Sequence, residues 1–118
     1  IEPCGFHLND KRLKKVAMDY FFKSKIITHK SYKDFLIKKK NSRIILMSTK
    51  AKKTYNNFKY EPEDIILFGR ESEGVPENVH RDCYQSLKIP LKKKARSLNI
   101  GMAVAITLTE ALRQNSNL

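Results

Sequence analysis

The chain has 118 residues, of which 24 are Lys or Arg and 12 are Asp or Glu, so its formal net charge is +12. This length fits one domain with a core of its own, and a hydrophobic fraction of 41% excludes a disordered chain. No apolar run approaches the roughly 18 residues that a membrane-spanning helix needs. The two cysteines, Cys4 and Cys83, are far apart and form no CxxC pair. This excludes a disulfide scaffold and a structural zinc site, and it favours a reducing, cytoplasmic location without a metal.

The beginning of the chain predicts two helices. Asp10 can cap a helix from Lys11 to about Met18, and Ser31 can cap a second helix that runs through Lys40. Between them, Ile26-Ile27 is a candidate for a short strand.

Two apolar runs in the middle of the chain predict strands that are buried on both faces. The first covers residues 43–47, and the second covers residues 64–68 and ends at Gly69. The polar residues 50–62 between them are expected to form a loop.

The last third of the chain predicts two further helices and a strand. A helix is expected from Pro76 to about Tyr84, a third strand over residues 87–91, and a long helix over residues 99–114. Strands that alternate with helices indicate an α/β domain with a mostly parallel sheet flanked by helices.

The long final helix is apolar around most of its circumference. A helix of this kind has to be buried in its own fold or in a subunit interface. Because a small domain can cover only one side of it, we expect a homodimer.

The positive charge is concentrated in one half of the chain. Residues 1–60 hold 16 basic and 4 acidic side chains, whereas residues 61–118 hold 8 of each. One interpretation is a solvated lysine surface, and the other is a binding surface for a polyanion. Nucleic acid is favoured over membrane, since no helix shows the aromatic, lysine-rimmed face of an interfacial helix.

Three loops follow the predicted buried strands, at the end of a parallel sheet where α/β proteins bind ligands. They begin at Ser48, Gly69 and Lys92. The second loop contains Gly-x-Glu-x-x-Gly over residues 69–74, whose glycines permit a positive φ or a close approach of the backbone to a ligand. Alone, this pattern is equally typical of a tight strand-to-helix turn, and it lacks the Lys and Ser/Thr of a phosphate-binding loop.

Several motifs together resemble the SpoU-type RNA ribose 2′-O-methyltransferases, in the order that the family has them. Residues 66–76, Ile-Leu-Phe-Gly-Arg-Glu-Ser-Glu-Gly-Val-Pro, are similar to the second family motif. The third motif is matched by residues 89–91, 96–100, 103–105 and 110–114. The opening residues 1–6, 10–15 and 19–20 resemble the short, single-domain branch, whose members methylate the wobble nucleotide of transfer RNA.

The resemblance implies a single domain over residues 1–118 with the SPOUT trefoil knot near its C-terminal end. In this knot, the C-terminal segment threads through a loop before its final helix, which periodicity cannot predict because knots are nearly absent from protein folds. The resemblance also places the first family motif, an Asn-x-Gly stretch and the main catalytic arginine, upstream of Ile1, with one strand and one helix. Those parts are expected to be missing from these residues.

The implied cofactor is S-adenosylmethionine, with S-adenosylhomocysteine as the product, bound in the knot of a homodimer. The positions that match cofactor contacts of the short branch are Met47, Gly69, Ile89, Ser97, Leu98 and Asn99. Apolar Met47, Ile89 and Leu98 can sandwich an adenine ring, while backbone groups near Gly69 and Ile89 read its edge. Asn99 can also cap the last helix, and the two roles can coexist.

The expected catalytic residues within these residues are Glu71 and Asn99. Since a sulfonium methyl is a strong electrophile, the protein has to align the 2′-oxygen and help remove its proton. Glu71 can orient a basic group or the substrate, or bind nearby backbone amides. His7, His29 and His80 are scattered and are expected to be surface or turn residues.

The residues expected to hold RNA phosphates lie beside the pocket and on the first helix. They are Lys11, Arg12, Lys14, Lys15, Lys92, Lys93, Lys94 and Arg96. The expected function is methylation of the ribose 2′-hydroxyl of a wobble cytidine or uridine in tRNA. A non-catalytic basic RNA-binding protein would explain the charge but not the paired motifs, and a phosphate-binding α/β domain is disfavoured by the missing loop lysine.

Overall fold

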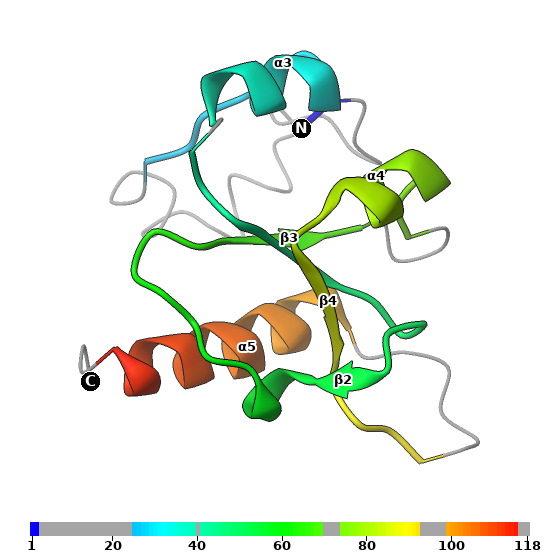
Figure 1. The fold of residues 1–118 in the computed structure, drawn as a ribbon, viewed down its shortest axis with the longest axis vertical. Coiled ribbons are helices and arrows are strands. Elements are labelled where there is room, and N and C mark those ends of the chain that lie inside the picture. Colours follow the sequence, from blue (N-terminus) through cyan, green and yellow to red (C-terminus); the bar gives the residue numbers. More distant parts are fainter. Residues whose placement is uncertain (3–24, 40, 70–73, 93–98, 116–118) are drawn as a thin grey trace, which may run out of the picture. The chain divides into compact units, whose positions relative to one another are not determined.

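The computed structural model describes residues 1–2, 25–39, 41–69, 74–92 and 99–115. The chain forms two compact units, Ile1–Asn41 and Ser42–Leu118. Figure 1 shows their helices and strands along the chain.

The first unit contains α3, a helix of residues Tyr32–Lys38. Ser31 caps this helix, because the backbone N–H of Asp34 donates to Ser31 Oγ at 3.1 Å. Phe35 is buried on its inner face, and the ring of His29 packs edge-on against it with 5.2 Å between the ring centroids. The predicted cap and helix are confirmed, although the helix ends at Lys38.

Two other predictions for this unit fare differently. Ile26 and Ile27 form no strand, and their exposed fractions are 51% and 52%, so that prediction was wrong. No strand among the described residues of this unit lies beside the two isoleucines to complete a ladder. The helix predicted over residues 11–18 lies outside the described residues.

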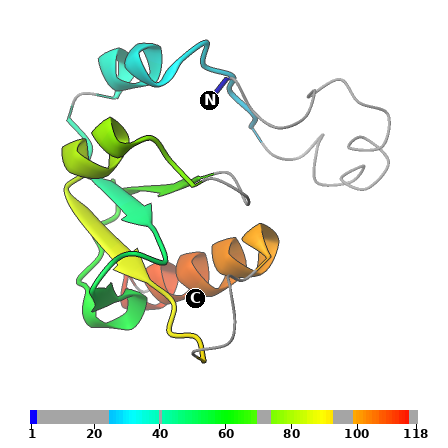
Figure 2. The same cartoon turned by 90° about the vertical axis from the view of Figure 1, so that its right-hand side faces the viewer.

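The second unit is built on a parallel sheet. Its four strands among the described residues are β1 (Ile44–Met47), β2 (Lys53–Thr54), β3 (Ile65–Phe68) and β4 (Gln85–Lys88). Their order is β2-β4-β1-β3, and every neighbouring pair is parallel. Figure 2 shows the sheet turned by 90°, with the C-terminal helix running along one side of it. The predicted α/β class with a parallel sheet is confirmed.

The strands predicted from the sequence differ in how deeply they are buried. In the central strand β1, Ile44, Ile45 and Leu46 are buried, as predicted. β3 was predicted to be buried on both faces, but it is only half-buried, because it is an edge strand of the described sheet. The third predicted strand is shifted towards the N-terminus, since β4 begins at Gln85 and ends before Ile89.

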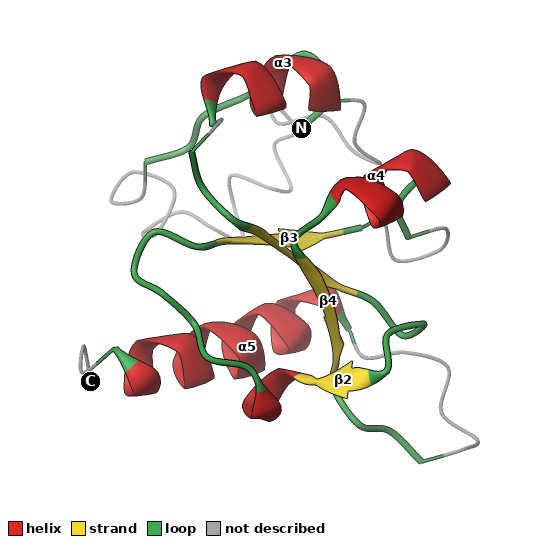
Figure 3. Ribbon diagram, viewed as in Figure 1, coloured by secondary structure: helices red, strands yellow, loops and turns green. Residues whose placement is uncertain are grey.

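The segment predicted as a loop between β1 and β3 contains regular structure. β2 and a single turn of 3-10 helix, η1 (Tyr55–Asn57), lie within it and appear in Figure 3 as short elements. β2 pairs with β4 through Lys53 opposite Leu87 and Thr54 opposite Lys88. Two polar residues carry no strand pattern of their own, so only the neighbouring strand makes them a strand.

Two helices complete the second unit. α4 (Glu77–Asp82) starts after Pro76, as predicted, and stops before Tyr84, whose backbone N–H donates to Ile44 O at 2.9 Å and so joins the sheet. α5 (Ile100–Gln114) matches the predicted final helix. None of the described helices is long and apolar enough to cross a membrane.

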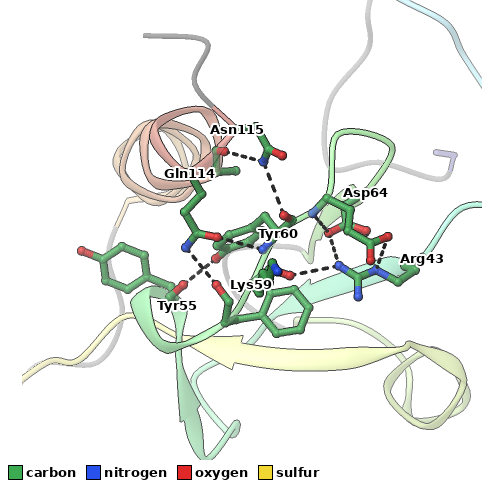
Figure 4. Close-up of polar contacts among 10 residues, drawn as sticks. Arg43, Tyr55, Lys59, Tyr60, Asp64, Gln114 and Asn115 are labelled. Carbon is green, nitrogen blue, oxygen red and sulfur yellow. Dashed lines mark hydrogen bonds and ion pairs between the residues drawn. The ribbon is translucent and has the colours of Figure 1, made fainter.

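The core of the second unit lies between the sheet and α5. Ile45, Phe58, Tyr60 and Leu87 form its buried cluster, with Ala111 of α5 packed against it. Burial, with a smaller contribution from Glu110, raises the pKa of Tyr60 to about 12. The Tyr60 hydroxyl therefore keeps its proton and donates it to the carbonyl of Tyr55 at 2.7 Å, which connects η1 to this core (Figure 4).

Arg43 and Asp64 form an ion pair that joins the amino ends of β1 and β3. Arg43 Nε donates to Asp64 Oδ1 at 2.7 Å, and Arg43 Nη2 donates to Asp64 Oδ2 at 2.6 Å (Figure 4). The guanidinium also lies over the rings of Phe58 and Tyr84, 5.1 and 4.7 Å from their centroids. Burial works against the charge of Asp64, but the hydrogen bonds from Arg43 and from the Glu61 N–H, together with the positive charge of Arg43, outweigh it and hold the pKa of Asp64 below its usual value.

Candidate functional site

The carboxyl ends of β4, β1 and β3 meet at one edge of the sheet, because these strands are neighbours and parallel. Met47, the last residue of β1, stands opposite Phe68 of β3 and Leu87 of β4. Gly69 and Ile89 are the next residues along those two strands. Three of the expected cofactor-contacting residues, Met47, Gly69 and Ile89, therefore lie at the same edge.

Two of these three residues supply apolar surface. Met47 and Ile89 are both half-buried, and Met47 packs against the core cluster. The adjoining backbone is held in place, since the N–H of Ser48 donates to Leu87 O at 2.8 Å. A half-buried apolar floor beside strand ends with backbone groups is the lining that a flat heterocycle such as adenine requires.

The backbones of Gly69 and Gly74 lie against each other. A Cβ at Gly69 would stand 2.5 Å from the carbonyl carbon of Gly74 and 2.8 Å from its Cα, so only glycine fits there. Gly74 has a φ of 69°, in the left-handed region that glycine adopts without strain. Both glycines thus have a structural role of their own, and direct contact of Gly69 with a cofactor stays a prediction.

Asn99 caps α5 at the side of the unit where the site lies. Its Oδ1 accepts a hydrogen bond from the backbone N–H of Gly101 at 2.9 Å, which confirms the predicted capping role. Figure 2 shows α5 beginning on the side towards which β3 runs. Because Oδ1 is engaged, the remaining Nδ2 can only donate, so Asn99 is suited to orient an oxygen and not to remove a proton.

Ser48 and His80 form a contact that sequence patterns did not predict. Ser48 Oγ lies 3.0 Å from His80 Nε2 and accepts from the backbone N–H of Lys50 at 3.1 Å. The contact links α4 to the first loop of the site. His80 is half-buried, and His29 of the first unit is 7% exposed, so the expectation of surface histidines was wrong for both. No spacing signal connects positions 48 and 80, which only the fold brings together.

Other expected site residues cannot be placed. Of the cation group beside the pocket, Lys92 is described, and it is exposed. Outside the described residues lie Glu71, Ser97, Leu98, Lys11, Arg12, Lys14, Lys15, Lys93, Lys94 and Arg96. The trefoil knot stays a prediction for the same reason, since residues 93–98 lead into α5.

The described residues include neither a metal cluster nor an activated thiol. No group of three or more His, Cys, Asp or Glu side chains gathers among them. Cys83 is a free cysteine whose pKa is raised by burial, which disfavours the reactive thiolate. What the described part of the site offers is apolar lining, backbone polar groups and the Asn99 amide.

These features define an α/β protein with a candidate ligand site at the carboxyl edge of a parallel sheet. The chain belongs to the SpoU rRNA methylase family, whose model matches residues 1–109.

Relatives within the family are similar over almost the whole chain. A tRNA (cytidine(34)-2′-O)-methyltransferase from Beijerinckia indica is 42% identical over 116 residues, covering 97% of this chain and 72% of the relative. A solved structure that describes 2′-OH methylation of C/U34 on tRNA has a TM-score of 0.90 and 32% identity, covering 98% of this chain and 76% of that one.

A more distant neighbour shares the fold alone. The SpoU methyltransferase AviRb from Streptomyces viridochromogenes, solved with AdoMet, has a TM-score of 0.83 at 18% identity and covers 96% of this chain and 47% of that one. Both solved structures confirm the fold class that the sequence predicts.

Proposed function

We propose that this protein transfers a methyl group from S-adenosylmethionine to the ribose 2′-hydroxyl of nucleotide 34, a cytidine or uridine, in tRNA. The observation that carries the proposal is the 42% identity to a tRNA (cytidine(34)-2′-O)-methyltransferase, which spans all three strand ends of the site. The free Cys83 fits the cytoplasmic location that the cysteine usage predicts.

The residues at the carboxyl edge fit the cofactor. Met47 and Ile89 provide half-buried apolar surface for the adenine ring, with Leu98 expected to complete it. Gly69 brings backbone groups to the same edge, Ser97 is expected to add a hydroxyl group, and the Nδ2 of Asn99 can donate to a cofactor or ribose oxygen. The bound cofactor supplies an electrophilic sulfonium methyl group.

The remaining work for the chain is alignment and proton removal. Asn99, held by its capping bond, keeps a donor in a fixed direction without reorganisation. Glu71 is proposed to orient the substrate or the arginine that the family carries in its first motif. The 2′-oxygen then attacks in line, which is mainly a matter of positioning.

The proposed assembly is a homodimer through α5. The stripe of Ala103, Thr107 and Ala111 is turned inwards, whereas Met102 and Leu108 on the same helix are 58% and 47% exposed. Large apolar side chains left in water on a helix are typical of an interface. Two copies of α5 would cover them.

Sedimentation equilibrium tests the dimer. We expect twice the mass of one chain for the parent protein at micromolar concentration, and a shift towards the single-chain mass for Leu108→Glu. The matched control is Ile37→Glu, since Ile37 is 59% exposed on α3 and should not change the mass. A parent protein with the mass of one chain contradicts the dimer.

The activity is tested with a tRNA transcript and labelled S-adenosylmethionine. We expect label at nucleotide 34, and none in a matched tRNA with 2′-deoxycytidine at that position, which lacks the acceptor oxygen. Calorimetry with S-adenosylhomocysteine separates the alternative. A folded protein that binds tRNA but not S-adenosylhomocysteine would be a non-catalytic RNA-binding protein.

A further inference from the structure

The lysines around β2 form a positive edge of the sheet. The sequence stretches 48–60 and 85–92, which contain β2 and β4, hold no Asp or Glu. Within them, Lys50, Lys52, Lys53 and Lys92 are exposed, and Lys88 is half-buried. We call these five residues the β2-edge lysines.

Topology gathers the β2-edge lysines next to the proposed cofactor site. Because β4 lies between β1 and β2, the residues that join β1 to β2 have to pass β4 close to its carboxyl end. Ser48 is bonded there to Leu87, and Lys53 stands opposite the same Leu87. Lys88 and Lys92 belong to the chain that leaves β4 at this point. Figure 1 shows β2 beside the end of β4.

Within the part of the chain that the structure describes, no carboxylate compensates the charge of the β2-edge lysines. The described residues form ion pairs at Lys38, Arg43 and Arg113, and none of the β2-edge lysines has a carboxylate partner among them. Lys53 lies in the edge strand β2 and Lys52 directly precedes it, so two exposed positive charges lie at this edge of the sheet.

We propose that the β2-edge lysines bind the phosphates of the tRNA next to the nucleotide that is methylated. This proposal rests on the proposed function and adds a part of the substrate-binding surface. Lysine is a point charge that neutralises phosphate without reading a base, so this edge fixes the position of the RNA and does not select its sequence.

Protection of the strand edge is the competing explanation. Charged side chains, lysine above all, keep an exposed edge strand from pairing with another molecule. The double variant Lys52→Glu/Lys53→Glu separates the two explanations, because it keeps charge on the edge but reverses its sign.

The experiment measures binding of a tRNA transcript at several salt concentrations. We expect Lys52→Glu/Lys53→Glu to bind roughly tenfold more weakly per lost phosphate contact at 0.1 M salt, and to flatten the slope of log affinity against log salt by about 2. The loss should be similar for tRNAs of different sequence. Affinity for S-adenosylhomocysteine should match the parent protein and shows that the site is intact.

The matched control is Lys30→Glu/Lys33→Glu, which changes the net charge equally at two exposed lysines of the first unit. An equal loss of tRNA affinity in this control would overturn the proposal, because binding would then follow net charge. Parent-like affinity and salt slope in Lys52→Glu/Lys53→Glu would also overturn it and leave edge protection. Failure of the parent protein to bind S-adenosylhomocysteine would instead contradict the proposed function.

Discussion

The side chain of Gln114 accepts a hydrogen bond from the backbone N–H of Tyr60 at 2.9 Å, across 54 positions of sequence (Figure 4). Its Nε2 donates to Phe58 O at 2.9 Å, so the amide pairs with two alternate residues as a neighbouring strand would. Asn115 adds a longer bond from Nδ2 to Tyr60 O at 3.5 Å. The end of α5 is thereby fixed to the segment that precedes β3.

Gln114→Met should therefore destabilise the fold. Methionine keeps the length of the side chain but leaves Tyr60 N–H and Phe58 C=O without partners, at a cost of about 2 kcal/mol in the free energy of unfolding. Urea unfolding measures this loss. Arg113→Met is the control, because Arg113 is exposed and, among the described residues, its side chain pairs only with Glu110 of its own helix. Equal stability of the two variants would contradict the role of Gln114.

Two substitutions at Asn99 should separate its effect on stability from its effect on methyl transfer. Asn99→Ser keeps an oxygen for the Gly101 N–H but removes the amide donor, whereas Asn99→Ala removes both. We expect Ala to lose about 1 kcal/mol of stability and Ser almost none. Both should lower the rate of methyl transfer, by roughly 100-fold if the amide orients the reacting oxygen. A Ser variant with parent-like transfer would restrict Asn99 to its capping role.

Gly69 and Gly74 should respond unequally to alanine. At Gly69 the new Cβ meets the backbone of Gly74 at 2.5 Å, so the two backbone segments have to move apart. At Gly74 the Cβ meets nothing within 4 Å, and the cost is the left-handed φ, about 1 kcal/mol. Chemical unfolding and calorimetry with S-adenosylhomocysteine should show the larger loss of stability and of affinity for Gly69→Ala. The reverse ranking would contradict the close approach of the Gly69 and Gly74 backbones.

Asp64 should make the free energy of unfolding depend on pH in the acidic range. Its pKa is lower in the folded than in the unfolded chain, so its contribution is present above about pH 4 and is lost as the pH falls through the folded pKa. Asp64→Asn should lose about 2 kcal/mol at pH 7, since Arg43 keeps its charge without a full partner, and should show a smaller further loss in acid. Urea unfolding between pH 7 and pH 2 tests this. Parallel pH profiles of parent and variant would contradict it.

Much of the fold could be predicted because its strongest elements carry local signals. β1 is a continuous apolar run in the centre of the sheet, and α5 begins directly after Asn99, which caps it. The predicted ends of β1 and β3 are the ends that bring Met47 and Gly69 together, whereas Ile89 was predicted inside a strand and follows the end of β4. For elements of this kind, local preference and tertiary packing agree.

The remaining features depend on partners that are distant in sequence. β2 exists because β4 lies beside it, and β3 is half-buried because of its place in the order of strands. The Ser48–His80 contact and the pairing of Gln114 with Tyr60 join positions with no common spacing pattern. Ile26 shows the opposite case, a residue type that favours strands but has no strand to pair with among the described residues of its unit.

The Arg43–Asp64 pair and the Gln114 anchor both act at the amino ends of the strands, while the loops of the site leave from the carboxyl ends. The contacts that stabilise the fold and the loops of the candidate site thus lie at opposite ends of the strands of one sheet. If the loops that directly follow β1, β3 and β4 were replaced by those of a relative, the stabilising contacts at the amino ends of the strands would be kept. Substrate preference can then diverge within this family without each change having to be compensated in the core, which makes the architecture a tolerant scaffold for evolution.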